Sequence, residues 1–215
     1  MTDSTPSSTR QQRTPKQTRG HLRVTAILEA CARLLVHQGV SNLTMHGIAR
    51  EAGTSIGSLY HFFSDKQQVL EALAQGHVAA MSAIAEPLDA VDESHWRSLS
   101  SRQVIEQIAL PLLQYIEQHP DLLQMLNPAY ALGQLQAPDL HAQMQSAYDR
   151  VLRVRLPRAS VRQRQTHVQA LLGLPLGLFQ RAQEQQELKR ELLLEEVPRA
   201  LEAYLAVIEG LYRQA

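Results

Sequence analysis

The sequence has almost no cysteine, no apolar run long enough to cross a bilayer and no persistent pattern of β-strands. Its single cysteine, Cys31, excludes an internal disulfide and a zinc site built from several cysteines, which favours a reducing compartment. No apolar run approaches the roughly 20 residues that a transmembrane helix needs. The first residues also lack the apolar core of a signal peptide. We therefore expect a cytoplasmic protein without a membrane segment.

Motifs that mark common classes of enzyme are missing too. The chain has no His-Glu-x-x-His zinc motif, no glycine-rich phosphate loop and no nucleophilic serine flanked by glycines. Its nine histidines are scattered without the spacing of metal ligands. Most acidic residues fall on faces that we expect to be exposed, where they solvate the surface. We expect no catalytic activity, no metal site and no cofactor.

The formal net charge is zero, but the charges are unevenly distributed. Residues 1–70 carry eight Lys and Arg against four Asp and Glu, so this part has a net charge of +4 and the remainder −4. Such a basic first third is typical of a segment that faces a polyanion, although solvated surfaces also show asymmetry of this size. Residues 1–20 are polar and we expect them to be disordered. Their cations would form an arm on DNA or a solvated tail: Arg10, Arg13, Lys16 and Arg19.

Helical periodicity and capping residues predict four helices in the first part of the chain. Their approximate ranges are 22–38, 45–52, 56–62 and 66–84. Gly39 would end the first helix and Gly53 the second, while Thr44 would cap the second and Thr54 or Ser55 the third. A capping box of Ser64 and Gln67 would begin the fourth. Two short helices joined by a tight glycine turn are typical of a helix-turn-helix.

The rest of the chain is also expected to be helical beyond a polar stretch at 89–101. Candidate helices cover 102–118, 121–131, 138–156, 160–186 and 189–213. Three contain an internal proline, which should kink or break them: Pro111, Pro175 and Pro198. The segment LLGLPLGLF at 171–179 and the last helix are so apolar that they favour a subunit interface, with a hairpin buried in one core as the alternative. The predicted interface residues are Leu174, Leu178, Leu201, Leu205 and Ile208.

The order and spacing of the motifs in residues 27–73 resemble the TetR family of bacterial transcription regulators. The residues that carry the resemblance are the glycine that ends the first helix, Leu43-Thr44, Ile48-Ala49, Ala52-Gly53, Gly57-Ser58-Leu59-Tyr60, Phe63, Lys66 and Leu70. Gly47 departs from the family, which more often has a polar residue there, and Thr54 stands where many members have valine. The remainder of the chain resembles the family only in being helical.

The resemblance implies an all-α protein with a three-helix helix-turn-helix DNA-binding domain at 21–84 and a helical effector-binding and dimerisation domain at 85–215. The third helix would enter the major groove, with other side chains on phosphates. The implied DNA contacts are Thr44, Thr54, Ser55, Gly57, Ser58, Tyr60, His61 and Lys66. For Thr44 and Tyr60 a purely structural role, as cap and core, remains open.

The family also implies a homodimer that binds a palindromic operator, most often as a repressor, and that a small-molecule effector releases. An apolar or aromatic effector is favoured, because few charged residues fall at predicted inner positions. Candidate pocket residues are Trp96, Tyr115, His119, Met125, Tyr130, Tyr148 and Phe179. The alternative from another class is a helical module that senses a small molecule without binding DNA; a salt-dependent affinity for duplex DNA would decide between them.

Overall fold

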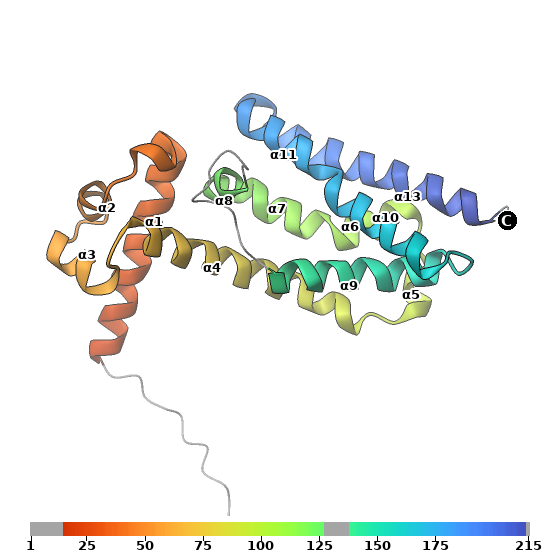
Figure 1. The fold of residues 1–215 in the computed structure, drawn as a ribbon, viewed down its shortest axis with the longest axis horizontal. Helices are drawn as coiled ribbons and strands as arrows, with labels where there is room; N and C mark the ends of the chain where they lie inside the picture. The colour runs from red at the N-terminus through yellow and green to blue at the C-terminus, as the bar shows by residue number, and fades with distance from the viewer. Residues whose placement is uncertain (1–14, 127–137, 214–215) are drawn as a thin grey trace, which may run out of the picture.

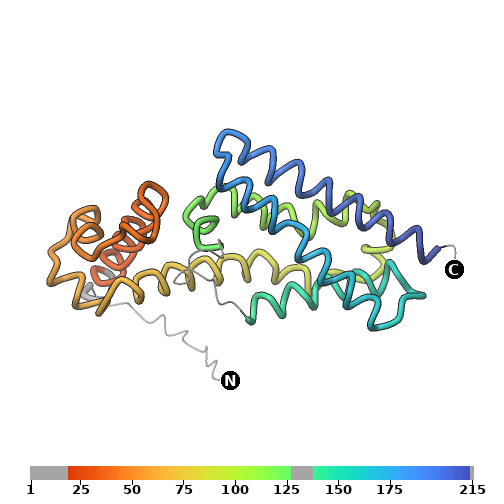
Figure 2. Tube along the Cα trace, turned by 45° about the horizontal axis from the view of Figure 1, so that its top comes forward, coloured from red at the N-terminus to blue at the C-terminus, as the bar shows by residue number. Residues whose placement is uncertain are grey.

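The protein consists of two helical bodies joined by one long helix. The computed structural model describes residues 15–126 and 138–213, and every regular element within them is helical, which confirms the predicted all-α fold (Figure 1). Helices α1 to α3 and the start of α4 form an N-terminal body, and α4 then runs into an elongated C-terminal bundle in both views (Figures 1 and 2). Within these ranges no helix is both long and apolar enough to cross a lipid bilayer.

Within 15–126 and within 138–213 the elements follow one another with short connections. The N-terminal body contains α1 (Pro15–Asn42), α2 (Met45–Glu51), α3 (Ile56–Phe62) and the first part of α4 (Lys66–Ala85). The bundle adds η1 (Glu86–Ala90), α5 (Glu93–Ser98), α6 (Ser101–Ile108), α7 (Leu110–Gln118), α8 (Pro120–Met125), α9 (Pro138–Arg155), α10 (Val161–Gly173), α11 (Pro175–Glu184), η2 (Gln186–Leu188), α12 (Lys189–Glu191), the π-helical turn η3 (Leu192–Glu196) and α13 (Val197–Arg213).

Helix α1 begins earlier than the sequence indicated. It starts at Pro15, a residue that suits the first turn of a helix because the N–H that proline lacks would have no partner there. Lys16 and Arg19 therefore belong to a helix and not to a disordered arm, while Arg10 and Arg13 lie outside the described residues. The prediction for Gly39 is confirmed: its φ of 72° ends the regular helix before Asn42.

The N-terminal body has its own hydrophobic core. The residues with no exposed surface in this core come from all four helices and are Ile27, Cys31, Leu35, Ile48, Leu59 and Val69. Burial raises the pKa of the Cys31 thiol to about 12, with the nearby charge of Asp121 adding to the effect. Cys31 is therefore a small buried apolar residue and not a reactive thiol.

The start of α4 differs by one residue from the predicted capping box. Asp65, not Ser64, is the N-cap: its carboxylate accepts a hydrogen bond from the Gln68 backbone N–H at 3.0 Å. The Gln68 side chain reaches back and accepts from the Ser64 N–H at 2.9 Å. The negative charge of Asp65 also interacts favourably with the positive end of the helix.

Each predicted internal proline coincides with a break or an irregular turn. The expected helix at 102–118 is divided at Ala109, before Pro111, and the one at 160–186 is divided at Leu174, before Pro175. A π-helical turn precedes Pro198 in the last helix, because proline offers no N–H to the carbonyl four residues earlier. Helix α8 ends at Met125, and residues 127–131 of the helix predicted at 121–131 lie outside the described residues.

The polar stretch at 89–101 contains a helix that periodicity did not reveal. Helix α5 is a short element capped by Asp92, whose carboxylate accepts from the Ser94 N–H at 2.7 Å. Its main apolar contribution is Trp96, of which only 1% is exposed. One large aromatic residue, and not a repeating stripe, therefore anchors this helix on α9, which explains why the hydrophobic pattern missed it.

Three of the five predicted interface residues are part of the chain's own core. Leu201, Leu205 and Ile208 are at most 2% exposed, and they pack with α6 and α9 residues in the core of the bundle. The apolar stripe of α13 thus faces inward, as a core helix requires. Leu174 is 45% exposed and Leu178 is half-buried, so these two positions remain accessible.

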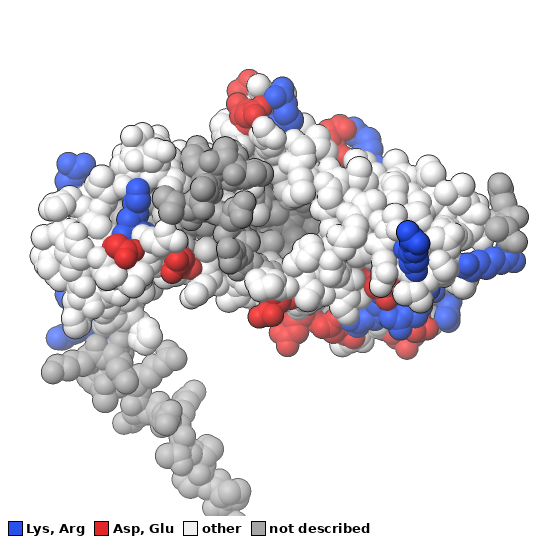
Figure 3. Space-filling view, viewed as in Figure 1, with Lys and Arg blue, Asp and Glu red and all other residues white. Residues whose placement is uncertain are grey.

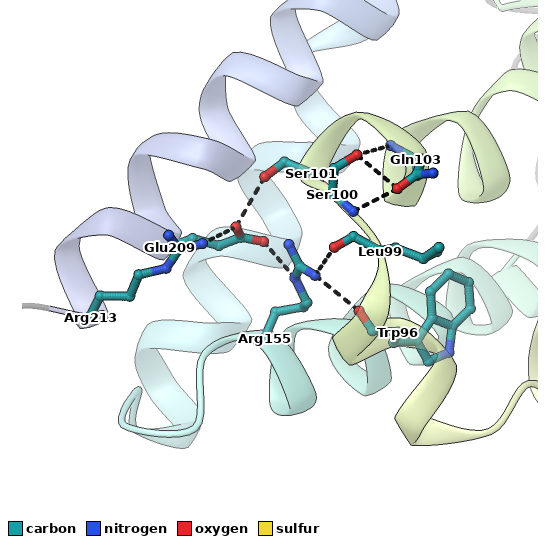
Figure 4. Close-up of polar contacts among 8 residues, drawn as sticks. All are labelled: Trp96, Leu99, Ser100, Ser101, Gln103, Arg155, Glu209 and Arg213. Atoms are coloured by element: carbon teal, nitrogen blue, oxygen red, sulfur yellow. Dashed lines mark hydrogen bonds and ion pairs between the residues drawn. The ribbon is translucent and has the colours of Figure 1, made fainter.

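A polar cluster ties α13 to α9 and to the loop before α6 (Figure 4). The ends of α9 and α13 that carry it lie at the end of the bundle far from the N-terminal body (Figure 1). The Arg155 guanidinium donates to Glu209 Oε1 at 2.7 Å and to the carbonyl oxygens of Trp96 and Leu99. Ser101 donates to the other Glu209 oxygen at 3.0 Å. Because Arg155 and Glu209 are both nearly buried, these added hydrogen bonds offset the cost of removing two charges from water.

Candidate nucleic-acid interface

Helices α2 and α3 are held at a fixed crossing by a tight turn. Gly53 has a φ of 62°, a conformation that favours glycine, and its N–H donates to the Arg50 carbonyl at 3.2 Å. The Thr54 N–H then donates to the Ala49 carbonyl at 2.9 Å. Where the two helices touch, Ile48 and Leu59 have no exposed surface. The predicted helix-turn-helix is therefore present, with α3 at the outer end of the N-terminal body (Figure 1).

The first turn of α2 explains why Gly47 stands in a helix. Thr44 is the N-cap, and its hydroxyl oxygen accepts from the Gly47 N–H at 3.1 Å. A Cβ added to Gly47 would lie 3.1 Å from the same oxygen, closer than side chains normally approach. A side chain at position 47 would therefore disturb the Thr44 cap. Glycine lowers the stability of the helix, but it leaves the hydrogen bond of the cap intact.

All eight predicted DNA contacts lie at or near the surface of this body. Thr44, Ser55, Gly57, Tyr60 and His61 are exposed, and Thr54, Ser58 and Lys66 are half-buried. On α3, the spacing of Gly57, Tyr60 and His61 places them on one exposed face, opposite the fully buried Leu59. Tyr60 is 50% exposed, which is unusual for so large a ring and leaves its hydroxyl available to a ligand.

Two of these residues also have partners within the chain. Ser55 is the N-cap of α3, because its hydroxyl oxygen accepts from the Ser58 N–H at 3.2 Å. The Lys66 ammonium group donates to the Val40 carbonyl at 3.3 Å, so it satisfies a carbonyl at the end of α1. An ammonium group has three donors, and this contact leaves others for a phosphate.

The sequence did not single out Arg23 as a site residue, but the structure places it beside α3. Its guanidinium Nη1 donates to Ser58 Oγ at 3.2 Å, across 35 residues of the chain. Arg23 lies one helical turn before the buried Ile27, so the apolar stripe of α1 continues into it. That register is the signal that could have identified it.

The charges of the N-terminal body are not evenly distributed over its surface. In Figure 3, Lys and Arg side chains appear at the outer edge of this body, and a basic side chain also lies near its middle beside an acidic side chain; no acidic side chain is visible at the outer edge. Arg33 of α1 is paired with Glu51 at 2.7 Å. The outer end therefore presents cations to an approaching polyanion.

The predicted pocket residues occupy several different places. Met125 is 2% exposed and packs in the core of the N-terminal body, because α8 lies against α1; it is therefore not part of a pocket within the bundle. Trp96 and Tyr148 share the main core of the bundle, and burial raises the pKa of the Tyr148 hydroxyl. Phe179 lines an apolar hollow of about 170 Å³ with Leu123 and Leu176. Tyr130 lies outside the described residues.

Tyr115 and His119 belong to a polar cluster centred on His77. Their rings are stacked with centroids 4.0 Å apart. The Nδ1 atom of His77 lies 2.9 Å from the Tyr115 hydroxyl, and its Nε2 atom lies 2.8 Å from Asp121 Oδ2. His77 is thus a packed, hydrogen-bonded histidine. The cluster joins α4 to α7 and α8 beside the N-terminal body.

Two family models match the chain over most of its length. The model described as bacterial regulatory proteins of the tetR family matches residues 27–73, and the one described as the tetracyclin repressor-like C-terminal domain matches residues 100–205. The chain belongs to the TetR family. Both models describe regulators, so the matches point to a regulatory protein rather than to an enzyme.

Individual TetR-family relatives match more locally. The chain is 47% identical to the HTH-type transcriptional regulator BetI of Agrobacterium fabrum over 49 residues, which are 23% of this chain and 24% of the relative. It is 30% identical to the HTH-type transcriptional regulator PksA of Bacillus subtilis over 100 residues, 46% of this chain and 45% of the relative. The chain thus spans less than half the length of these curated relatives.

A solved structure of the TetR family agrees over nearly the whole fold. The complex of SmeT with triclosan aligns with a TM-score of 0.64 and 20% identity, covering 86% of this chain and 91% of that one. SmeT is described as the repressor of a multidrug efflux pump of Stenotrophomonas maltophilia. At this identity the likeness concerns the fold alone.

Proposed function

We propose that this chain is a DNA-binding transcriptional repressor that acts as a homodimer on a palindromic operator and is released by a small-molecule effector. The observation that carries the proposal is the exposed face of α3, with Gly57, Tyr60 and His61 at the outer end of a firmly packed helix-turn-helix. Such a face has no role in the chain's own core and has the shape that the major groove admits.

The contacts we propose divide into those that position the protein and those that choose the sequence. Thr44, Tyr60, His61 and Lys66 would bind phosphates, while Thr54, Ser55, Gly57 and Ser58 would approach base edges. Gly57 supports this assignment, because a Cβ there would have nothing within 4 Å in the free protein. Its bare backbone leaves space that a base can occupy.

For the dimer we propose a surface formed by the outer faces of α10, α11 and α13. Its apolar members are far more exposed than core residues: Leu174 (45%), Leu176 (61%), Val207 (62%) and Leu211 (62%). The helices lie side by side, and His167 of α10 hydrogen-bonds to Tyr204 and Tyr212 of α13 at 2.8 and 3.2 Å (Figure 2). Residues 165–180 contain no Asp, Glu, Lys or Arg, which favours a surface that a second copy covers.

The dimer would place two α3 helices roughly 34–36 Å apart, one turn of DNA. Helix α4 enters both bodies, so a ligand that moves it within the bundle would also move α3. The ligand can release DNA only as far as it prefers the released conformation. Leu178 stands beside this surface and remains a proposed contact.

The effector we propose is a small apolar or aromatic molecule that carries a hydrogen-bond acceptor. Trp96 supports a hydrogen-bond acceptor on the effector, because its Nε1–H donor is buried and has no hydrogen-bond partner within the described part of the chain. Tyr115 and Phe179 pack against the same small hydrophobic cluster, and His119 stacks on Tyr115; these rings support the aromatic character. The structural relative SmeT binds triclosan, an observation made on that protein.

The test is direct. Duplexes selected from a random pool should bind the purified protein with an affinity that falls steeply as salt increases. Lys66→Met should weaken binding to all sequences and reduce the slope of log affinity against log salt by about 1. Tyr60→Phe should weaken binding without changing the slope, because it removes a neutral hydroxyl. Duplex affinity that does not depend on salt or on these residues would reject the proposal.

A further inference from the structure

Arg23 and Ser58 join the first helix to the proposed reading helix through one hydrogen bond. The distance from Arg23 Nη1 to Ser58 Oγ is 3.2 Å. Arg23 is exposed and Ser58 is half-buried, so the bond lies at the surface, next to the exposed face of α3. This inference rests on the proposed function, because it concerns how α3 would read DNA.

The fold positions Arg23 firmly. Ile27, one turn later on α1, has no exposed surface and packs in the same core as Leu59 of α3. Arg23 therefore lies one turn from the buried Ile27, and Ser58 lies next to the buried Leu59. The helical start at Pro15 continues α1 beyond Arg23, which keeps the arginine in a regular helix and limits its rotamers.

The chemistry of the two groups gives the bond a direction. A guanidinium group can only donate, whereas a serine hydroxyl has one O–H donor and two acceptor lone pairs. Arg23 must therefore donate to Ser58 Oγ. The Ser58 backbone N–H is already used, because it donates to Ser55 Oγ at 3.2 Å. Ser58 Oγ is then left with its O–H and one lone pair, so its capacity to accept is halved while its capacity to donate is kept.

Other hydroxyls on helices in the same protein behave differently. Thr25 donates its hydroxyl to the His21 carbonyl at 3.1 Å, and Thr166 donates to the Arg162 carbonyl at 3.0 Å. Each of these hydroxyls donates its hydrogen bond to a backbone carbonyl of its own helix. Ser58 instead accepts from Arg23, and within the described residues its hydroxyl donates to no carbonyl of its own helix, so its O–H is available to another acceptor.

We propose that Arg23 is a specificity-determining residue that acts through Ser58. By occupying a lone pair of Ser58 Oγ, it makes the hydroxyl a hydrogen-bond donor toward the major groove. A donor selects a base edge that accepts, such as O6 or N7 of guanine or O4 of thymine. It disfavours the N4 amino group of cytosine, which is itself a donor. Arg23 thus sets a base preference without touching the base.

The experiment compares operator selection and salt-dependent affinity for the full chain, four single variants and the double variant that combines Arg23→Met with Ser58→Ala. Arg23→Met removes the donor and keeps the apolar stem, Arg23→Lys restores a donor, and Ser58→Ala removes the hydroxyl. Arg33→Met is the matched control, since it removes one exposed charge from the same helix, and Arg33 pairs with Glu51 rather than with α3. Circular dichroism establishes that each variant is folded.

At one base pair of each half-site, Arg23→Met should reduce the preference for the accepting base by about fivefold, the factor that corresponds to about 1 kcal/mol of base discrimination. Ser58→Ala should relax the same base pair, and the double variant should lose no more than either single one. Arg23→Lys should retain part of the preference. The salt slope of Arg23→Met should equal that of Arg33→Met.

Two outcomes would overturn the inference. An unchanged base preference in Arg23→Met together with a salt slope lower by about 1 would mean that Arg23 holds a phosphate. Relaxation at different base pairs in Arg23→Met and Ser58→Ala would mean that the two residues act separately. If the unmodified protein binds no duplex, the proposed function itself fails and takes this inference with it.

Discussion

The Nε2 atom of His77 lies 2.8 Å from Oδ2 of Asp121, and both residues are more than nine-tenths buried. The pair joins α4 to the start of α8, which packs on α1, and the Tyr115 hydroxyl occupies the other nitrogen of the imidazole. A polar contact of this kind holds only in one geometry, because each buried group needs its partner. It therefore defines how the bundle meets the N-terminal body.

Breaking this pair should destabilise the whole protein. We expect Asp121→Ala to lower the free energy of unfolding by about 3 kcal/mol or more, because it leaves His77 without its acceptor. The double variant with His77→Leu should cost less than the sum of the single changes. Urea denaturation measures both. As a control, Asp149→Ala removes a partly exposed acid that pairs with Arg153 and Arg164, and it should cost clearly less.

The stability that the His77–Asp121 pair contributes should depend on pH. Burial raises the pKa of Asp121, but the hydrogen bond and the charge of His77 outweigh burial, so the net pKa lies below its usual value. A lowered pKa in the folded state gives stability that is present above the unfolded pKa of about 3.9 and is lost as pH falls through the folded pKa. The stability difference between the protein and Asp121→Asn should therefore shrink below about pH 4. A difference that stays constant between pH 3 and 7 would contradict the assignment.

Charged substitutions should have different effects on the outer surface of the bundle and in its core. Leu176→Glu or Val207→Glu should give folded monomers in analytical ultracentrifugation, because both side chains are more than half exposed. Leu205→Glu should unfold the protein, since it places a charge at a position that is 1% exposed. Leu22→Glu, on an exposed site of α1, should leave the oligomeric state unchanged. A dimer that survives both surface changes would exclude the proposed interface.

Two glycines in the helix-turn-helix should respond differently to alanine. Gly57→Ala should stabilise the free protein by up to about 1 kcal/mol, because a Cβ there meets nothing within 4 Å and alanine favours a helix. The same methyl group should weaken DNA binding if α3 approaches the bases. Gly47→Ala should bring no such gain in stability, because its Cβ would lie 3.1 Å from the Thr44 cap oxygen. Thermal melts and duplex titrations of both variants measure these effects.

Much of the N-terminal body could be predicted from local pattern. Gly39 and Gly53 have the positive φ that their positions indicated, and Thr44 and Ser55 cap the helices that they precede. The bounds of α3 agree with the prediction at both ends. These features depend on residues within one or two turns of each other, so periodicity and capping chemistry are sufficient to locate them.

Periodicity alone could not decide which apolar faces the chain covers by itself. The stripe of Leu201, Leu205 and Ile208 has the same pattern whether α6 and α9 or a second subunit packs against it, and only the tertiary structure shows that the chain buries it. The same limit applies to Met125, Trp96 and Arg23, whose partners lie far away in the sequence. Local sequence thus determined most of the N-terminal helices and their ends, but not the start of α1 or the presence of α5. The packing of distant segments decided the core, the exposed apolar surface and the contact that directs Ser58, because burial and hydrogen-bond partners depend on neighbours that the local sequence does not specify.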